Sequence, residues 1–274
     1  MRFAFINDHF IPEENATIHY RDLSIQRGYG VFDFFKVVAG KPVFLNDHLE
    51  RFHYSAKQMR LVVPYSQNEL NEIISGLIKR NNISDSGIKL TLTGGYSEDG
   101  YHLGTPNFIV AQQDYIKPSA EVKQGGLKLV TYPYQRQLPQ VKTIDYLMAI
   151  WLQSLLAEKE ADDILYHNNG LVSECPRSNI FIVTKKGEII TPLNNILRGI
   201  TRKHVLVTAK GNYKTEERNI SLDELKNARE AFITSTTKMI APVAQIDGLV
   251  LDTQNNKITK DLITQFSKGF AFSY

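Results

Sequence analysis

The chain has 274 residues, enough for about two domains at roughly 150 residues each. Hydrophobic residues make up 42% of the chain and charged residues 22%, which is typical of globular proteins and excludes disordered and fibrous classes. The net charge is +3, and the basic residues are scattered in ones and twos, so the sequence indicates no nucleic-acid-binding surface. We expect any anion that it binds to be small.

The cysteine count and the apolar segments indicate the compartment. Cys175 is the single cysteine and cannot form a disulfide within the chain, and a lone thiol fits a reducing environment. The apolar stretch at residues 1–6 is too short for a signal sequence, and no run of about 18 apolar residues could cross a membrane. We therefore predict a cytoplasmic protein that binds neither membrane nor nucleic acid, and we predict no metal site.

The N-terminal part of the chain favours an α+β domain, residues 1–112. The predicted elements are two strands around a turn at Asn7-Asp8, a helix from Asn46 capped by Asn46 or Asp47, a helix after Ser66, and strands over residues 88–93 and 107–112. Strands, two adjacent helices and further strands are not the alternation that a parallel βαβ sheet requires.

Residues 113–126 lose the periodicity and predict a linker, which a second domain, residues 127–274, follows. Its predicted elements are a strand over 127–132, a helix over 145–159, hairpins turning at Asn169-Gly170 and Lys186-Gly187, helices over 201–210 and from Ser221, strands over 231–235 and 243–251, and a helix over 259–270.

Two loops of the second domain have the chemistry of a phosphate site. Gly199-Ile200-Thr201-Arg202 opens a helix, where unpaired N–H groups and the helix dipole attract anions. Thr234-Ser235-Thr236-Thr237 is a run of hydroxyls directly after a strand. Each loop alone also fits an ordinary turn. The planar guanidinium of Arg51 could complete a phosphate site, or Arg51 could lie on a solvated helix face.

Lys142 and Glu174 are the candidate reactive groups. Lys142 lies between apolar residues just before a helix, and a nucleophilic lysine must be buried enough to lose its proton. Glu174 ends a strand rich in apolar residues, where a carboxylate needs a cation.

In this order, these motifs resemble the class IV pyridoxal-phosphate enzymes, which include branched-chain aminotransferase, D-amino-acid aminotransferase and aminodeoxychorismate lyase. The resemblance covers nearly the whole chain. Its segments are Arg27–Asp33, Leu45–Phe52 with Ser55-Ala56, Lys142, Ser173-Glu174 leading to Ser178–Phe181, Thr191-Pro192, Ile196–Arg202 and Thr234–Thr237.

The resemblance implies a two-domain α+β fold, class IV aminotransferase-like, with the active site between the domains, and usually a homodimer. It implies that Lys142 holds pyridoxal 5'-phosphate covalently and moves the proton between the substrate Cα and the cofactor C4′. It implies that Glu174 pairs with the pyridine nitrogen. The remaining cofactor-binding residues would be Arg51, the amides of Ile200 and Thr201, Thr236 and Thr237 at the phosphate, and Leu197 on the ring.

The chain departs from the family pattern at several positions. Cys175-Pro176-Arg177 replaces the usual small residues after the glutamate, which favours a different turn there. Leu147 stands where branched-chain enzymes carry a tyrosine that supports the cofactor hydroxyl. Gly94 replaces the arginine with which D-amino-acid enzymes bind the substrate carboxylate. Lys89 aligns with an arginine of branched-chain enzymes, although a nearby tyrosine is replaced by Gly87.

These features favour an aminotransferase of amino-acid metabolism, branched-chain-like, that takes an apolar L-amino acid and a 2-oxo acid. Phe32 with Phe34 would form an apolar wall, Lys89 would bind carboxylate, and Tyr96 would line the pocket or cover the surface. A lyase of the aminodeoxychorismate type and a D-amino-acid aminotransferase remain the alternatives. A cofactor-free scaffold would require damage to the lysine, the glutamate or the phosphate loops, and all three are intact.

Overall fold

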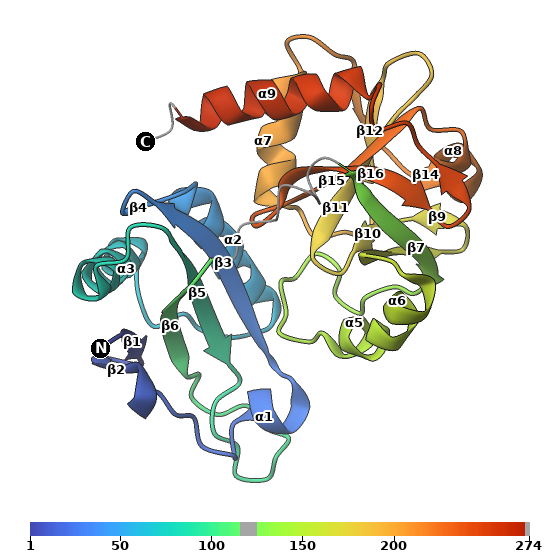
Figure 1. The fold of residues 1–274 in the computed structure, drawn as a ribbon. Coiled ribbons are helices and arrows are strands. Elements are labelled where there is room, and N and C mark those ends of the chain that lie inside the picture. The colour runs from blue at the N-terminus through green and yellow to red at the C-terminus, as the bar shows by residue number, and fades with distance from the viewer. Residues whose placement is uncertain (116–124, 272–274) are drawn as a thin grey trace. The chain divides into compact units, whose positions relative to one another are not determined.

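The computed structural model describes residues 1–115 and 125–271 and divides into two compact units (Figure 1). Unit 1 comprises Met1–Ile116 and Val141–Asp145, and unit 2 comprises Lys117–Gln140 and Tyr146–Tyr274. The predicted linker, residues 113–126, lies mostly outside the described residues. The predicted second domain, residues 127–274, needs one correction, because Val141–Asp145 hydrogen-bonds to a strand of unit 1.

Unit 1 is built on a six-stranded antiparallel sheet in the order β2-β1-β6-β5-β3-β4. The strands are β1 (Phe3–Ile6), β2 (His9–Pro12), β3 (Gly30–Val38), β4 (Lys41–Pro42), β5 (Ser86–Thr93) and β6 (Phe108–Gln113). The predicted hairpin is confirmed, and Asn7 has the positive φ of 54° that its tight turn requires. Strands and two long helices confirm the predicted α+β class.

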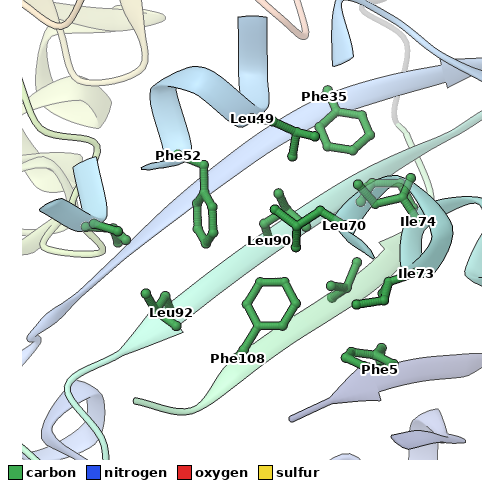
Figure 2. Packing of buried hydrophobic residues seen from close by; sticks show 14 of the residues in the cluster. Phe5, Phe35, Leu49, Phe52, Leu70, Ile73, Ile74, Leu90, Leu92 and Phe108 are labelled. Atoms are coloured by element: carbon green, nitrogen blue, oxygen red, sulfur yellow. The ribbon is translucent and has the colours of Figure 1, made fainter. Parts of the chain in front are cut away.

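The helices of unit 1 are the short η1 (Glu13–Asn15) and α1 (Leu23–Arg27), then α2 (Leu45–Gln58) and α3 (Gln67–Asn81). Figure 2 shows the core that α2 and α3 form with the sheet. Its labelled side chains are Phe5, Phe35, Leu49, Phe52, Leu70, Ile73, Ile74, Leu90, Leu92 and Phe108. The predicted cap of α2 is wrong, because the helix already begins at Leu45 and its N-cap residue is Phe44, which has no side-chain oxygen.

Unit 2 contains an eleven-stranded mixed sheet along the path β13-β12-β11-β15-β16-β7-β8-β9-β14, with β10 beside β11 and β17 beside β16. The strands are β7 (Leu127–Pro133), β8 (Asp163–Asn168), β9 (Leu171–Val172), β10 (Glu174–Cys175), β11 (Ser178–Val183), β12 (Ile189–Thr191), β13 (Thr215–Glu217), β14 (Ile220–Ser221), β15 (Glu230–Ser235), β16 (Met239–Ile246) and β17 (Leu249–Val250). Both predicted hairpins are confirmed.

The helices of unit 2 are α5 (Leu147–Trp151), α6 (Gln153–Lys159), α7 (Ile200–Ala209), α8 (Leu222–Lys226) and α9 (Lys257–Ala271). The predicted helix over 145–159 is divided at Leu152, a buried residue between α5 and α6. The predicted strand over 243–251 is divided into the end of β16 and β17, because Asp247 adopts a positive φ of 49° and turns the chain between them. Within the described ranges, no helix combines the length and the apolar character that a membrane span requires.

Candidate functional site

Lys142 is held by the backbone and by α2 within unit 1. The amide of Phe32 donates to the carbonyl of Lys142 at 3.0 Å, and the amide of Ile144 donates to the carbonyl of Gly30 at 3.1 Å. The segment therefore lies along the first half of β3. The amide of Lys142 donates to Oγ of Ser55, on α2, at 3.2 Å. These bonds fix the main chain from which the lysine side chain extends.

The ring of Phe32 brings two lysines together. Nζ of Lys142 lies 4.4 Å from the ring centroid, and Nζ of Lys89 lies 5.1 Å from it. Both distances are within the range of a cation–π contact. Both ammonium groups therefore contact the same aromatic ring, and Lys89 comes from β5, the strand adjacent to β3.

Phe34 covers a glycine on the neighbouring strand. A Cβ atom added to Gly87 would lie 2.3 Å from Cζ of Phe34, so the phenylalanine ring occupies the space that a side chain at position 87 would need. In the strand register, Phe34 is opposite Lys89. The absence of a side chain at position 87 therefore leaves room for the ring of Phe34, which lies opposite Lys89.

Arg51 is fixed by a buried carboxylate that sequence reasoning missed. Its Nε and Nη2 donate to Oδ2 and Oδ1 of Asp33, both at 2.8 Å. Nδ1 of His48 lies 2.7 Å from Oδ1 of the same aspartate. His48, Arg51 and Ser55 are spaced at i, i+3 and i+7 and so share one face of α2. The alternative of a solvated helix face is wrong for Arg51, whose side chain is only 10% exposed.

The charges of this cluster oppose the cost of burial. Burial by itself raises the pKa of Asp33, but Arg51 and His48 outweigh it and hold that pKa well below its usual range. Burial lowers the pKa of His48, so its neutral form is favoured, with Nδ1–H donating to Asp33. Nη1 of Arg51 takes part in neither bond to Asp33 and is the guanidinium nitrogen suited to an anion.

In unit 2, three adjacent strands place polar side chains in a row. Glu174 on β10 is opposite Asn179 on β11, which is opposite Thr234 on β15. Oε2 of Glu174 accepts from Nδ2 of Asn179 at 3.2 Å and from the amide of Leu197 at 2.9 Å. The carbonyl of Leu197 accepts from the same Asn179 at 2.8 Å. The structure therefore brings Glu174 and Leu197 together, as the resemblance implies.

The expected cation beside Glu174 is Arg136, a residue that sequence reasoning did not identify. Nη2 and Nε of Arg136 donate to Oε1 of the glutamate at 2.7 and 3.1 Å. Arg136 stands alone between polar residues in the segment after β7, so neither a motif nor a periodic pattern could have indicated its partner.

The start of α7 lies against Asn179. A Cβ atom added to Gly199 would lie 2.1 Å from Oδ1 of Asn179, so the close approach requires glycine. No side chain caps this helix, and the first amides of a helix, here those of Ile200 and Thr201, have no partner within it. Arg202, in the first turn of α7, is buried, and its Nη2 donates to the carbonyl oxygen of Pro192 at 2.8 Å. An anion would meet a fixed set of N–H donors here.

The hydroxyl run lies where β15 turns into β16. Oγ1 of Thr234 is buried and, within the described part of the chain, has no hydrogen-bond partner. Oγ of Ser235 lies 3.4 Å from Oγ1 of Thr237 and accepts from the amide of Lys238 at 3.1 Å. Thr236 is half-buried and Thr237 is exposed. Because Thr234 is opposite Asn179, this turn and α7 approach the same row of residues.

The other predicted positions have separate surroundings. Tyr96, in the loop after β5, is 46% exposed, pairs with Asp22 and packs against the ring of His19. Its predicted role in substrate binding stays a prediction. Cys175 ends β10, and Pro176-Arg177 forms the turn to β11 with Arg177 exposed, which supports the interpretation as a turn. Burial raises the pKa of the Cys175 thiol.

Comparisons with known proteins agree with this arrangement. The family model for amino-transferase class IV matches residues 30–246. A D-alanine aminotransferase of Listeria monocytogenes is 30% identical, over 96% of this chain and 94% of that protein. The structure of an Escherichia coli branched-chain amino acid aminotransferase matches with a TM-score of 0.91 at 25% identity, over 98% and 94% of the two chains. A putative 4-amino-4-deoxychorismate lyase of Legionella pneumophila matches with a TM-score of 0.85 at 25% identity, over 94% and 97%. The predicted fold is confirmed.

Proposed function

Because the chain belongs to the class IV aminotransferases, which use pyridoxal 5'-phosphate, we propose that it transfers the amino group of an apolar L-amino acid to a 2-oxo acid. The bound cofactor supplies an electron sink for the negative charge that develops at the substrate Cα. The observation that carries the proposal is the row of Glu174, Asn179 and Thr234, to which Leu197 and the start of α7 are joined.

The residues present fit this cofactor. Its phosphate needs N–H and O–H donors, and within unit 2 the amides of α7 and the hydroxyls of Thr236 and Thr237 would supply them. The resemblance to the family adds the guanidinium of Arg51, in unit 1, as a proposed further donor. Its ring nitrogen needs a buried acid when protonated, which is Glu174. The orphaned buried hydroxyl of Thr234 adds a polar group without an internal partner in the described chain.

Lys142 is proposed to carry the cofactor and, once displaced by the substrate amine, to hold and move the proton at Cα. An amine can act as a base only when it is neutral. The bonds of the Lys142 main chain to β3 and Ser55 fix the origin of this side chain, so that the proton is moved at a defined position.

The substrate class is proposed from the face of β3 and β5. Lys89 supplies a positive charge for the substrate carboxylate, and the rings of Phe32 and Phe34 supply apolar surface beside it. A D-specific carboxylate anchor at position 94 is disfavoured, because a Cβ atom at Gly94 would lie 3.0 Å from Leu23 and 3.1 Å from Tyr29. An arginine there would have to displace both side chains.

A D-amino-acid aminotransferase is the second candidate, favoured by the 30% identity to the Listeria monocytogenes D-alanine aminotransferase. The distinguishing experiment mixes the purified holoenzyme with L- and D-leucine and with L- and D-alanine, one at a time, and follows the conversion to the pyridoxamine form by absorbance in single turnovers. Faster conversion with L-leucine supports the proposal, and faster conversion with the D-forms overturns it. No conversion, together with pyruvate release from aminodeoxychorismate, would assign the lyase activity instead.

Lys89 allows a sharper test of the substrate site. Lys89→Met should raise the KM for leucine with a smaller effect on kcat, because carboxylate binding is lost in both the ground state and the transition state. Lys89→Arg should lower the KM, since guanidinium binds carboxylate through two bonds. An unchanged KM in both variants would place the carboxylate elsewhere.

We also propose a cytoplasmic homodimer. Ile150 and Trp151 on α5 are 63% and 64% exposed, which is unusual for large apolar side chains and typical of surfaces that a second copy covers. Light scattering should give twice the chain mass of 31.2 kDa, and Trp151→Glu should weaken the dimer. A wild-type monomer at all concentrations would overturn this proposal.

A further inference from the structure

Arg136 is the residue from which a further inference follows. Its guanidinium donates twice to Oε1 of Glu174, at 2.7 and 3.1 Å, and its side chain is only 18% exposed. Nη2 also donates to the carbonyl of Pro139, three residues before Lys142 in the chain. One side chain thereby joins the proposed partner of the ring nitrogen to the segment that leads to the proposed catalytic lysine.

Four donors already converge on the carboxylate of Glu174. Oε1 accepts from the two Arg136 nitrogens, and Oε2 accepts from Asn179 and from the amide of Leu197. A carboxylate has about four lone-pair positions. A ring N–H must therefore share an oxygen with one of these donors. The donors of Asn179 and Leu197 are neutral, so among these three residues Arg136 carries the charge that balances the glutamate.

We propose that Arg136 is a positioning residue that keeps the Glu174 carboxylate ionised and oriented for the ring nitrogen of the cofactor. The inference rests on the proposed function, because it assumes that Glu174 meets this nitrogen. A buried carboxylate that loses its cation is costly, and the protein can relieve that cost by taking up a proton. A protonated Glu174 no longer attracts a protonated ring, so the cofactor would be held less tightly.

The variants leave the other charges near this pair in place. Other titratable groups interact with this pair or with its neighbours among the described residues: Cys175 on the same strand, Arg198 and Arg202 at the start of α7, and Tyr134, Asp163, Tyr166 and Lys238. Burial raises the pKa values of Cys175 and Tyr166, so both stay neutral around neutral pH. Any new pH dependence in an Arg136 variant is therefore assigned to Glu174.

The test measures the dissociation constant of pyridoxal 5'-phosphate from the full-length chain between pH 6 and 9, for wild type, Arg136→Met and Arg136→Lys. The ratio of variant to wild-type constants is plotted, so that ionisations of the free cofactor cancel. For Arg136→Met this ratio should rise as the pH falls, by up to about tenfold per pH unit, because one proton is taken up. Arg136→Lys should show a smaller rise in this ratio, since lysine keeps the positive charge but lacks the planar guanidinium that donates two hydrogen bonds to one carboxylate.

Two controls make the result specific. Arg229→Met removes an exposed arginine of the same unit and should leave the ratio at one across the range. In a Glu174→Gln background, Arg136→Met should add no pH dependence, because no carboxylate remains to titrate. A flat ratio for Arg136→Met, or a slope that survives Glu174→Gln, overturns the inference. Should Arg136→Met fail to fold, Arg136→Gln, which also removes the charge, decides by the same slope.

The same experiment separates this inference from the proposed function. If wild type binds the cofactor and Lys142→Ala changes its absorbance, while Arg136→Met behaves as wild type, only the role of Arg136 fails. If wild type does not bind the cofactor, the proposed function fails and this inference fails with it.

Discussion

Asp33→Asn tests the buried cluster that fixes Arg51. The carboxylate is fully buried and accepts two bonds of 2.8 Å from Arg51 and one of 2.7 Å from His48. Asparagine keeps the shape but removes the charge, and its NH₂ group turns a donor toward one of the arginine donors. The guanidinium then remains buried without a counter-charge, because its side chain is only 10% exposed.

Removing one partner of a buried ion pair costs about 3–5 kcal/mol. We expect the lower end, about 3 kcal/mol, since Nη1 of Arg51 lies outside both bonds to Asp33 and can reach water or an anion. For a unit of this size, that corresponds to a fall in Tm of roughly 10 °C. The mutation should also weaken binding of the cofactor phosphate, because Arg51 is no longer held in one orientation.

The assay is thermal unfolding followed by far-UV circular dichroism, which reports on both units, and by fluorescence of Trp151, the single tryptophan, which lies in unit 2. The matched control is Asp114→Asn, which makes the same chemical change at an exposed ion pair with Arg2 in the same unit and should leave the Tm nearly unchanged. Equal transitions for the two variants in circular dichroism would refute the reasoning.

Three further predictions concern single contacts. Gly87→Ala should destabilise unit 1 by about 1–3 kcal/mol in urea unfolding, because the new methyl overlaps the Phe34 ring, and Phe34→Leu should relieve part of the loss. Gly199→Ala should weaken cofactor binding in a fluorescence titration, because its methyl displaces Asn179 from the start of α7, and an unchanged affinity would contradict this. The folded-state pKa of His48 lies below its ordinary value of 6.5, so its stabilisation is complete above pH 6.5 and is lost as the pH falls toward the folded-state value. The unfolding free energy should therefore decrease below that pH, and His48→Asn should flatten the profile.

Local sequence patterns predicted most of the helices and strands. They failed where contacts between distant residues determine the local structure. The hairpin at Asn7 and the start of the helix after Ser66 were predicted correctly because turn and cap residues are specified over two to four positions. β3 was not predicted, because this strand carries apolar residues on both faces and shows no alternation. It also missed α1, which has a single turn and a cap at Asp22.

In the candidate site too, residues within contiguous sequence motifs were predicted, and residues that pair only in the folded chain were not. Glu174, Leu197 and the start of α7 belong to contiguous motifs, and the structure joins them through Asn179. Asp33 and Arg136 instead act across 18 and 38 residues of sequence, on Arg51 and Glu174. A single sequence carries no signal for such pairs, because the chain must fold before the two charges meet.

The proposal that Lys142 carries the cofactor is tested by locating the point of attachment. The purified protein is reduced with borohydride, digested, and its peptides are sequenced by mass spectrometry. We expect one phosphopyridoxyl group per chain, on Lys142, and none in Lys142→Ala. A label on another lysine, or a wild-type protein that takes up no label after incubation with pyridoxal 5'-phosphate, would contradict it.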